Sequence, residues 1–153
     1  MHRATGFTLV ELVTTIILIG ILSVIVLPRM LTSSSYSAFT LRGEFISELR
    51  KAQIFAMNTQ GQCYRVAVDT QGYQFKRFSD LACTVAMNPT ESKRNFEGNA
   101  SLSLINGDTS FNIDFSGNNN GIPSLVCSGP CINVIADETL VINIESQGYI
   151  HAS

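Results

Sequence analysis

The stretch Gly6-Phe7-Thr8-Leu9-Val10-Glu11 decides how the first part of this chain folds, because a long apolar run follows it directly. The run covers residues 12–27 without a charged side chain, and Pro28-Arg29 closes it. From Phe7 to Pro28 there are 22 residues. As an α-helix rising about 1.5 Å per residue they reach roughly 33 Å, which matches the ~30 Å hydrocarbon core of a bilayer. The sequence therefore predicts one helix of membrane length over residues 7–30.

Glu11 is the one charged residue between Phe7 and Pro28. An ionised carboxylate below the lipid headgroups costs several kcal/mol unless a partner neutralises it. Cleavage after Gly6 would supply such a partner, because it frees a positively charged amino group on Phe7. If the amino group of one copy meets Glu11 of another, the contact is heterologous and propagates as a helical filament.

The same residues resemble the N-terminal signature of type IV pilins and pseudopilins. Besides the run from Gly6 to Leu12, the likeness rests on a six-residue leader (residues 1–6) with Arg3, on the mid-helix Gly20 and on Pro28. The resemblance implies that the first helix is both a membrane anchor and the core of a filament.

The resemblance also implies how the chain is processed and where it goes. The prepilin peptidase, a membrane aspartyl peptidase, cuts between Gly6 and Phe7 and N-methylates Phe7, and Glu11 orders subunit docking. Further implied partners are other pilins or pseudopilins, bound through the N-terminal helix, an inner-membrane assembly platform, and the lipid bilayer before assembly. The implied location is a single pass through the bacterial inner membrane with a cytoplasmic N-terminus, and later a periplasmic or surface pilus.

Two plainer interpretations of the segment fit less well. A secretory signal needs an A-x-A-like site after its apolar region, and residues 23–28 contain none. An ordinary single-span anchor leaves Glu11 unexplained. Arg3 and Arg29 lie on either side of the span, so a count of positive charges does not set its orientation.

Length and composition fit one modest domain behind the helix. The chain has 153 residues, of which 45% are hydrophobic, and a formal net charge of −2. We divide it into a leader (1–6), a transmembrane or filament-core helix (7–30), an amphipathic helix (31–60) and a β-rich exported domain (61–153). Residues 31–153 carry eight Lys or Arg and eleven Asp or Glu, and this net of −3 argues against a domain built to grip phosphate backbones.

Four cysteines on the exported side predict disulfides, with three possible connectivities. The spacing favours Cys127 with Cys131, across a turn that contains Gly129 and Pro130, and Cys63 with Cys83. The rival interpretation is a zinc site, but the C-x3-C spacing is unusual for zinc and only His151 could complete it after leader removal. We expect no metal and no cofactor.

A second helical stretch follows the span. Apolar residues recur with helical spacing between residues 36 and 59, at Leu41, Phe45, Leu49, Ala52 and Ala56. Charged residues lie mostly off this stripe. A softer joint of Thr and Ser at residues 32–35 precedes it, and Gly61 ends it. The stripe should cover a sheet.

The rest of the chain predicts strands. Alternating segments at residues 64–68 and 73–78 flank a turn in which we expect Gly72 to be left-handed. Further strands are expected at 102–105, 111–115, 132–135, 140–144 and 148–150, with polar loops at 86–98 and 116–123. The predicted fold class is α+β: the pilin fold, in which a long N-terminal hydrophobic helix, kinked near Pro28, packs on an antiparallel β-sheet body with disulfides.

The body adds a finer resemblance, to the H-type pseudopilin and minor-pilin branch. It rests on residues 49–58 before a hairpin, on Gly121-Ile122-Pro123 after a strand, and on the closing segments 141–144 and 148–150. The four-cysteine pattern is most similar to minor pilins of the mannose-sensitive haemagglutinin (MSHA) pilus. This likeness implies a minor pilin that acts in pilus assembly or adhesion. An H-type pseudopilin of a type II secretion system is the alternative.

Catalytic motifs are missing from the sequence. No G-x-S-x-G, Walker loop, H-E-x-x-H or dinucleotide fingerprint occurs, His2 leaves with the leader, and His151 lies next to the C-terminus. We therefore expect a structural protein, not an enzyme.

A DNA-binding minor pilin is a further alternative. Its candidate contacts are basic residues on the first hairpin and in the polar loop, namely Arg65, Lys76, Arg77, Lys93 and Arg94. Strand alternation places Arg65 and Lys76 opposite the apolar residues, which favours an ordinary solvated sheet face over a nucleic-acid groove.

Overall fold

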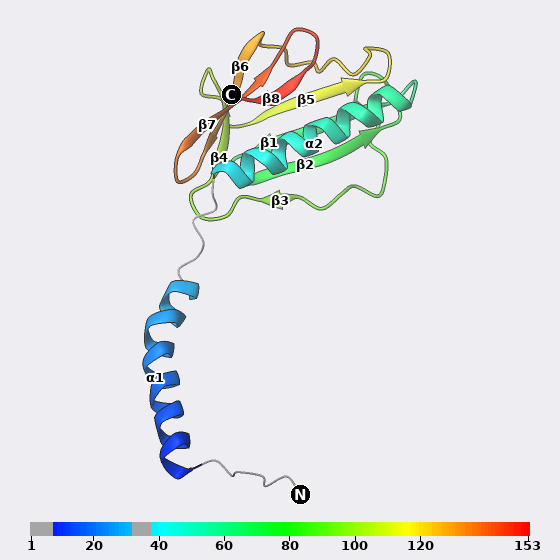
Figure 1. Cartoon of the computed structure of the whole chain (residues 1–153). Helices are drawn as coiled ribbons and strands as arrows, with labels where there is room; N and C mark the ends of the chain where they lie inside the picture. The colour runs from blue at the N-terminus through cyan, green and yellow to red at the C-terminus, as the bar shows by residue number, and fades with distance from the viewer. Residues whose placement is uncertain (1–7, 32–37) are drawn as a thin grey trace, which may run out of the picture. The chain divides into compact units, whose positions relative to one another are not determined.

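The computed structural model describes residues 8–31 and 38–153, which belong to two compact units (Figure 1). The first unit contains the helix α1 (Leu9–Leu31). Thr8 is its N-cap: the Thr8 Oγ1 accepts a hydrogen bond from the Glu11 N–H at 3.2 Å, and the Thr8 carbonyl accepts one from the Leu12 N–H at 3.1 Å. An acidic side chain in the first turn also suits the positive end of the helix dipole.

The helix predicted over residues 7–30 corresponds to α1, while Phe7 and the leader lie outside the described residues. Across residues 8–31 and 38–153, no helix has both the length and the apolar character that crossing a membrane requires. The transmembrane assignment of residues 7–30 therefore stays a prediction. Pro28 lies within α1, and the kink expected near it also stays a prediction.

The second unit begins with the helix α2 (Ala38–Asn58), which confirms the helical stripe expected between residues 36 and 59. Leu41, Phe45 and Leu49 are buried at 1% exposure or less, because they lie on the face that the periodicity selects. The helix ends at Asn58, three residues before the predicted Gly61, which lies in the following turn with a φ of +78°, the left-handed conformation that glycine tolerates best. The joint predicted at residues 32–35 falls outside the described residues.

Two four-stranded antiparallel sheets make up the rest of the second unit. The first has the order β3-β2-β1-β5, from β1 (Cys63–Asp69), β2 (Gly72–Phe78), β3 (Arg94–Asn95) and β5 (Phe111–Ser116). The second has the order β4-β6-β7-β8, from β4 (Ser101–Leu104), β6 (Gly129–Ile135), β7 (Thr139–Ile144) and β8 (Ile150–Ala152). The α+β class and the antiparallel pairing are as predicted.

The core lies between α2 and the two sheets. The helix contacts β1 and β5 of the first sheet and β6, β7 and β8 of the second, and Figure 1 shows it lying over β1 and running along β2 and β5. Phe45 of α2 meets the ring of Tyr73 edge-on, with centroids 5.1 Å apart. Burying a side chain as large as Phe45 contributes about 1.5–3 kcal/mol. One continuous cluster thus joins the helix to both sheets.

Three of the four sheet edges are protected. β3 is only two residues long. β5 is bridged by Ser124, whose N–H donates to the Asp114 carbonyl at 2.7 Å and whose Oγ accepts from the Asp114 N–H at 2.9 Å. At β8, Arg50 of α2 donates to the Ile150 carbonyl at 2.8 Å. Such edges offer few free backbone groups to another chain.

Two sequence expectations for the β region are wrong. Residues 86–98 are not wholly a loop, because Arg94 and Asn95 pair with Tyr73 and Gly72 as β3. Gly72 is not left-handed either. Glycine is required at position 72 because a Cβ there would collide with the Arg94 carbonyl oxygen. The missing side chain lets β2 approach β3 closely.

Both predicted disulfides are present, Cys63–Cys83 and Cys127–Cys131, each with a Cα–Cα distance of 5.4 Å. The bonded cysteines leave no thiolate for the rival zinc site. Within the described residues, one group has metal-ligand spacing, namely Cys63, Cys83 and Asp114, and its two sulfurs are joined to each other.

Candidate functional site: an apolar helix with one carboxylate

α1 exposes an extensive apolar surface. Ten of its large apolar side chains, between Leu9 and Leu22, are 41–79% exposed. Their positions point to every side of the helix at 3.6 residues per turn. Surfaces of this kind mark places where another apolar partner must cover the protein.

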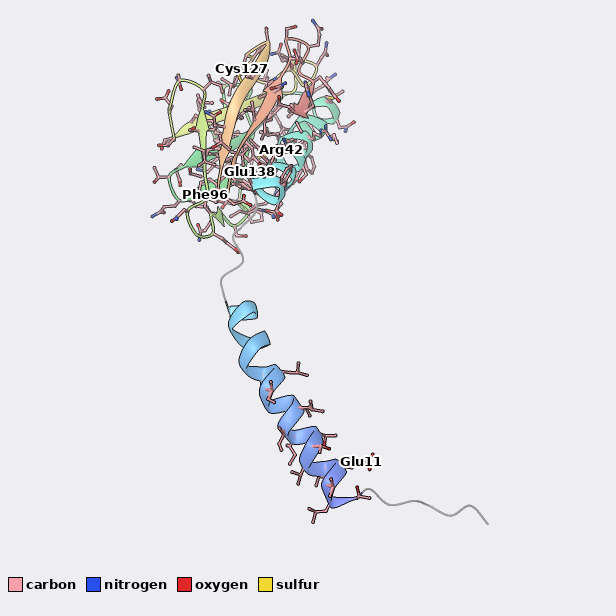
Figure 2. All side chains as sticks on the ribbon, turned by 60° about the vertical axis from the view of Figure 1, so that its left-hand side comes forward. Glu11, Arg42, Phe96, Cys127 and Glu138 are labelled. Atoms are coloured by element: carbon pink, nitrogen blue, oxygen red, sulfur yellow. A yellow bond between two sulfur atoms is a disulfide. The ribbon has the colours of Figure 1, made fainter. Side chains whose placement is uncertain are left out.

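Glu11 interrupts this apolar surface near the start of α1 (Figure 2). It is the only charged residue between positions 8 and 23. Its carboxylate forms no hydrogen bond or ion pair with any residue of the described ranges. The predicted partner, the amino group that cleavage after Gly6 would expose on Phe7, lies outside those ranges.

The other polar side chains of this stretch are satisfied within the helix. The Thr14 hydroxyl donates to the Glu11 carbonyl at 3.0 Å, the Thr15 hydroxyl to the Leu12 carbonyl at 2.8 Å and the Ser23 hydroxyl to the Ile19 carbonyl at 2.7 Å. Hydroxyls bonded in this way add little polarity to the helix surface. Between residues 8 and 23, Glu11 is therefore the one charged side chain that α1 offers a partner.

The basic residues of the first hairpin lie in different environments. Arg65 forms a two-pronged ion pair with Asp114, through Nε–Oδ1 at 2.5 Å and an Nη2–Oδ2 bond at 2.7 Å. The hydrogen bond to Asp114 outweighs partial burial and raises the pKa of Arg65. Lys76 is the direct cross-strand neighbour of Arg65 and has no ion pair among the described residues. Arg77 donates to the Pro89 carbonyl at 3.4 Å.

The two basic residues of the long loop also meet carboxylates. Lys93 pairs with Asp69 at 2.7 Å, and this hydrogen bond lowers the pKa of Asp69, with help from the Gln71 N–H. Arg94 lies 4.0 Å from Glu48. Three of the five candidate nucleic-acid contacts thus face an acidic partner. The structure does not bring the five together as an unopposed basic surface.

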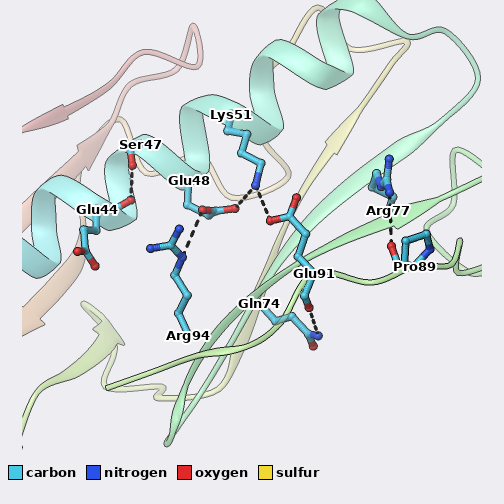
Figure 3. Close-up of polar contacts among 9 residues, drawn as sticks. All are labelled: Glu44, Ser47, Glu48, Lys51, Gln74, Arg77, Pro89, Glu91 and Arg94. Carbon is cyan, nitrogen blue, oxygen red and sulfur yellow. Dashed lines mark hydrogen bonds and ion pairs between the residues drawn. The ribbon is translucent and has the colours of Figure 1, made fainter. Parts of the chain in front are cut away.

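A charged network at the edge of α2 was not foreseen from the sequence (Figure 3). The Glu48 side chain is only 8% exposed, and its Oε1 accepts from Lys51 Nζ at 2.9 Å. Lys51 also reaches Glu91 at 2.6 Å and lies 4.4 Å from the centre of the Phe75 ring. Burial lowers the pKa of Lys51, but the hydrogen bonds to Glu91 and Glu48 prevail and the net shift is upward. The i,i+3 spacing of Glu48 and Lys51 was the one available signal.

His151, the other residue of the rival zinc site, is engaged elsewhere. Its Nε2 lies 3.1 Å from the Glu145 carboxylate, and its ring stacks on Tyr149 with centroids 4.9 Å apart. The bond to Glu145 raises the pKa of His151.

No family model, curated protein sequence or solved structure matches this chain.

Proposed function

We propose that this chain is a minor pilin, a structural subunit of a type IV pilus that acts in pilus assembly or adhesion and is incorporated through its N-terminal helix. The observation that carries the proposal is the Glu11 carboxylate, which has no partner in the part of the chain that the structure describes and lies on an apolar helix whose Thr14, Thr15 and Ser23 hydroxyls are bonded internally. The N-terminal motif from Gly6 to Leu12 and the disulfide-linked α+β body support it.

In this proposal, the prepilin peptidase cuts between Gly6 and Phe7, and the new amino group of one copy pairs with Glu11 of its neighbour. Apolar burial of α1 is similar in a bilayer and in a bundle of helices, so it favours neither location. The ion pair between Glu11 and the amino group of Phe7 favours the bundle. Two unit charges about 4 Å apart attract by about 4 kcal/mol at an effective dielectric of about 20.

The test uses Glu11→Ala in cells that carry the assembly machinery. We expect normal cleavage and membrane insertion, and at least about a tenfold loss of the chain from the sheared filament fraction, because about 1.4 kcal/mol already corresponds to a factor of ten. Thr15→Ala is the matched control, since it removes a polar side chain that the helix already satisfies. If the filament fraction contains as much of the Glu11→Ala variant as of the Thr15→Ala variant, the docking proposal is contradicted.

Processing is tested separately with Gly6→Val. The branched side chain should block the peptidase, so the protein should keep its full length on an immunoblot. Mass spectrometry of the wild-type N-terminus should find methylated Phe7. Mature-length protein from Gly6→Val would contradict the proposed cleavage site.

An H-type pseudopilin of a type II secretion system would use the same helix and the same carboxylate. Gene deletion distinguishes the two proposals. Loss of surface filaments with normal exoprotein secretion supports the minor pilin, and the reverse result supports the pseudopilin. DNA capture is the weaker alternative, because Arg65, Lys93 and Arg94 already face carboxylates.

A further inference from the structure

The two disulfides lie in very different surroundings. Cys63 is fully buried and Cys83 is 7% exposed, and both pack with Phe78 in an apolar cluster of their own. Cys127, labelled in Figure 2, is exposed, whereas its partner Cys131 is only 1% exposed. A thiol in solution therefore meets an exposed cysteine at the second bond, whereas both cysteines of the first bond are buried.

Cys131 is held in place without its disulfide. It lies in β6, and its carbonyl accepts a hydrogen bond from the Ile105 N–H at 3.1 Å. On either side, Pro130 pairs with Asn143 and Ile132 with Ile142. The bond closes a loop of sequence separation 4, compared with 20 for Cys63–Cys83. Opening it would therefore release only the short exposed segment before β6.

The loop sizes also set how strongly each bond is coupled to folding. In the chain-entropy model the contribution of a disulfide to the unfolding equilibrium grows as the 3/2 power of loop length. For separations of 20 and 4 the ratio is about eleven. Opening Cys127–Cys131 should therefore raise the unfolding equilibrium constant of the body by a factor about ten times smaller than opening Cys63–Cys83 does.

We propose that Cys127–Cys131 is a thiol–disulfide exchange site, open to a dithiol reductant, and that Cys63–Cys83 is the permanent structural bond. The attacking thiolate forms a bond to Cys127 Sγ, the Cys127–Cys131 bond breaks, and its electron pair leaves on Cys131, which takes a proton from water. The second thiol of the reductant then attacks the mixed disulfide. Cys127 leaves as a thiolate, and the dithiol becomes a disulfide.

The first test exposes the full-length chain to dithiothreitol in mild detergent, alkylates the thiols at intervals and maps them by mass spectrometry. Cys127 and Cys131 should be labelled at least about ten times faster than Cys63 and Cys83, because attack on the buried bond must wait for local opening. The circular dichroism spectrum should not change. Equal labelling of all four cysteines, or earlier labelling of Cys63 and Cys83, would overturn the proposal.

A second test checks which sulfur is attacked. In Cys131→Ser the thiol of Cys127 should form a mixed disulfide with oxidised glutathione at least about ten times faster than the thiol of Cys131 does in Cys127→Ser. Both variants lack the same bond, so each controls for its loss in the other. Equal rates would refute the assignment of Cys127. None of these readouts involves α1, so they succeed or fail independently of the pilin proposal.

Discussion

Lys51→Met tests whether the network at Glu48 stabilises the body. The Glu48 side chain is 8% exposed, and Lys51 Nζ at 2.9 Å is its nearest positive group, with Arg94 next at 4.0 Å. Methionine keeps the length of the lysine stem over Phe75 and removes only the charge and its hydrogen bonds. The substitution therefore leaves a nearly buried carboxylate with a single distant partner.

The size of the effect follows from these exposures. Breaking a fully buried pair by removing one partner costs about 3–5 kcal/mol. Lys51 is 33% exposed and Arg94 remains, so we discount this to about 2 kcal/mol. With a urea m-value of about 1–3 kcal/mol/M, the midpoint should fall by roughly 1 M.

Urea titration followed by circular dichroism measures this midpoint. Glu91→Gln is the matched control, because it removes the other and more exposed partner of Lys51, at 47% exposure, and should cost less than about 1 kcal/mol. The double variant Glu48→Gln/Lys51→Met should regain part of the loss, since it no longer buries an unpaired charge. If Lys51→Met costs no more than Glu91→Gln, the reasoning is refuted.

Two further predictions concern Tyr73 and two glycines. Burial, with the negative charge of Glu44 next in effect, raises the pKa of Tyr73 to about 12, and among the described residues no group bonds its hydroxyl in good geometry, although Arg94 is near enough to oppose the shift. Tyr73 therefore ionises less readily in the folded state than in the unfolded state, and its contribution to stability is full below pH 10 and falls as the pH rises toward 12. In alkaline urea titrations, Tyr73→Phe should remove this fall. At pH 7 the same variant should raise the free energy of unfolding by about 1 kcal/mol. Gly43→Ala, at a helical site with open space around it, should stabilise the body by about 0.5–1 kcal/mol, whereas Gly72→Ala should destabilise it by more than that by colliding with the backbone of β3; equal midpoints for the two variants in thermal denaturation would contradict this.

The parts of the fold that depend on local pattern could be predicted from the sequence. The spacing of Leu41, Phe45 and Leu49 identified α2 and its buried face, and alternation identified the β1–β2 hairpin. The close spacing of Cys127 and Cys131 predicted one disulfide, and the remaining pair followed.

The parts that depend on distant residues could not be predicted. Glu48 is buried because Lys51 and Arg94 neutralise it, and Arg94 lies in a strand that a polar loop of the chain brings back to β2. No local pattern encodes that return. For the same reason Gly72 was assigned to a turn conformation, when the constraint on it comes from Arg94 across the sheet.

The protected sheet edges have a consequence for any crowded array of these molecules. If many copies stand side by side along a fibre, every exposed strand would meet identical strands at very high local concentration, the condition under which cross-β aggregates nucleate. Pairing between edge strands of neighbouring copies is hindered at three of the four edges, by the short β3, by the Ser124 bridge on β5 and by the Arg50 cap on β8. Lateral growth by backbone pairing is thereby discouraged, and the neighbours that a copy acquires are selected by side chains instead.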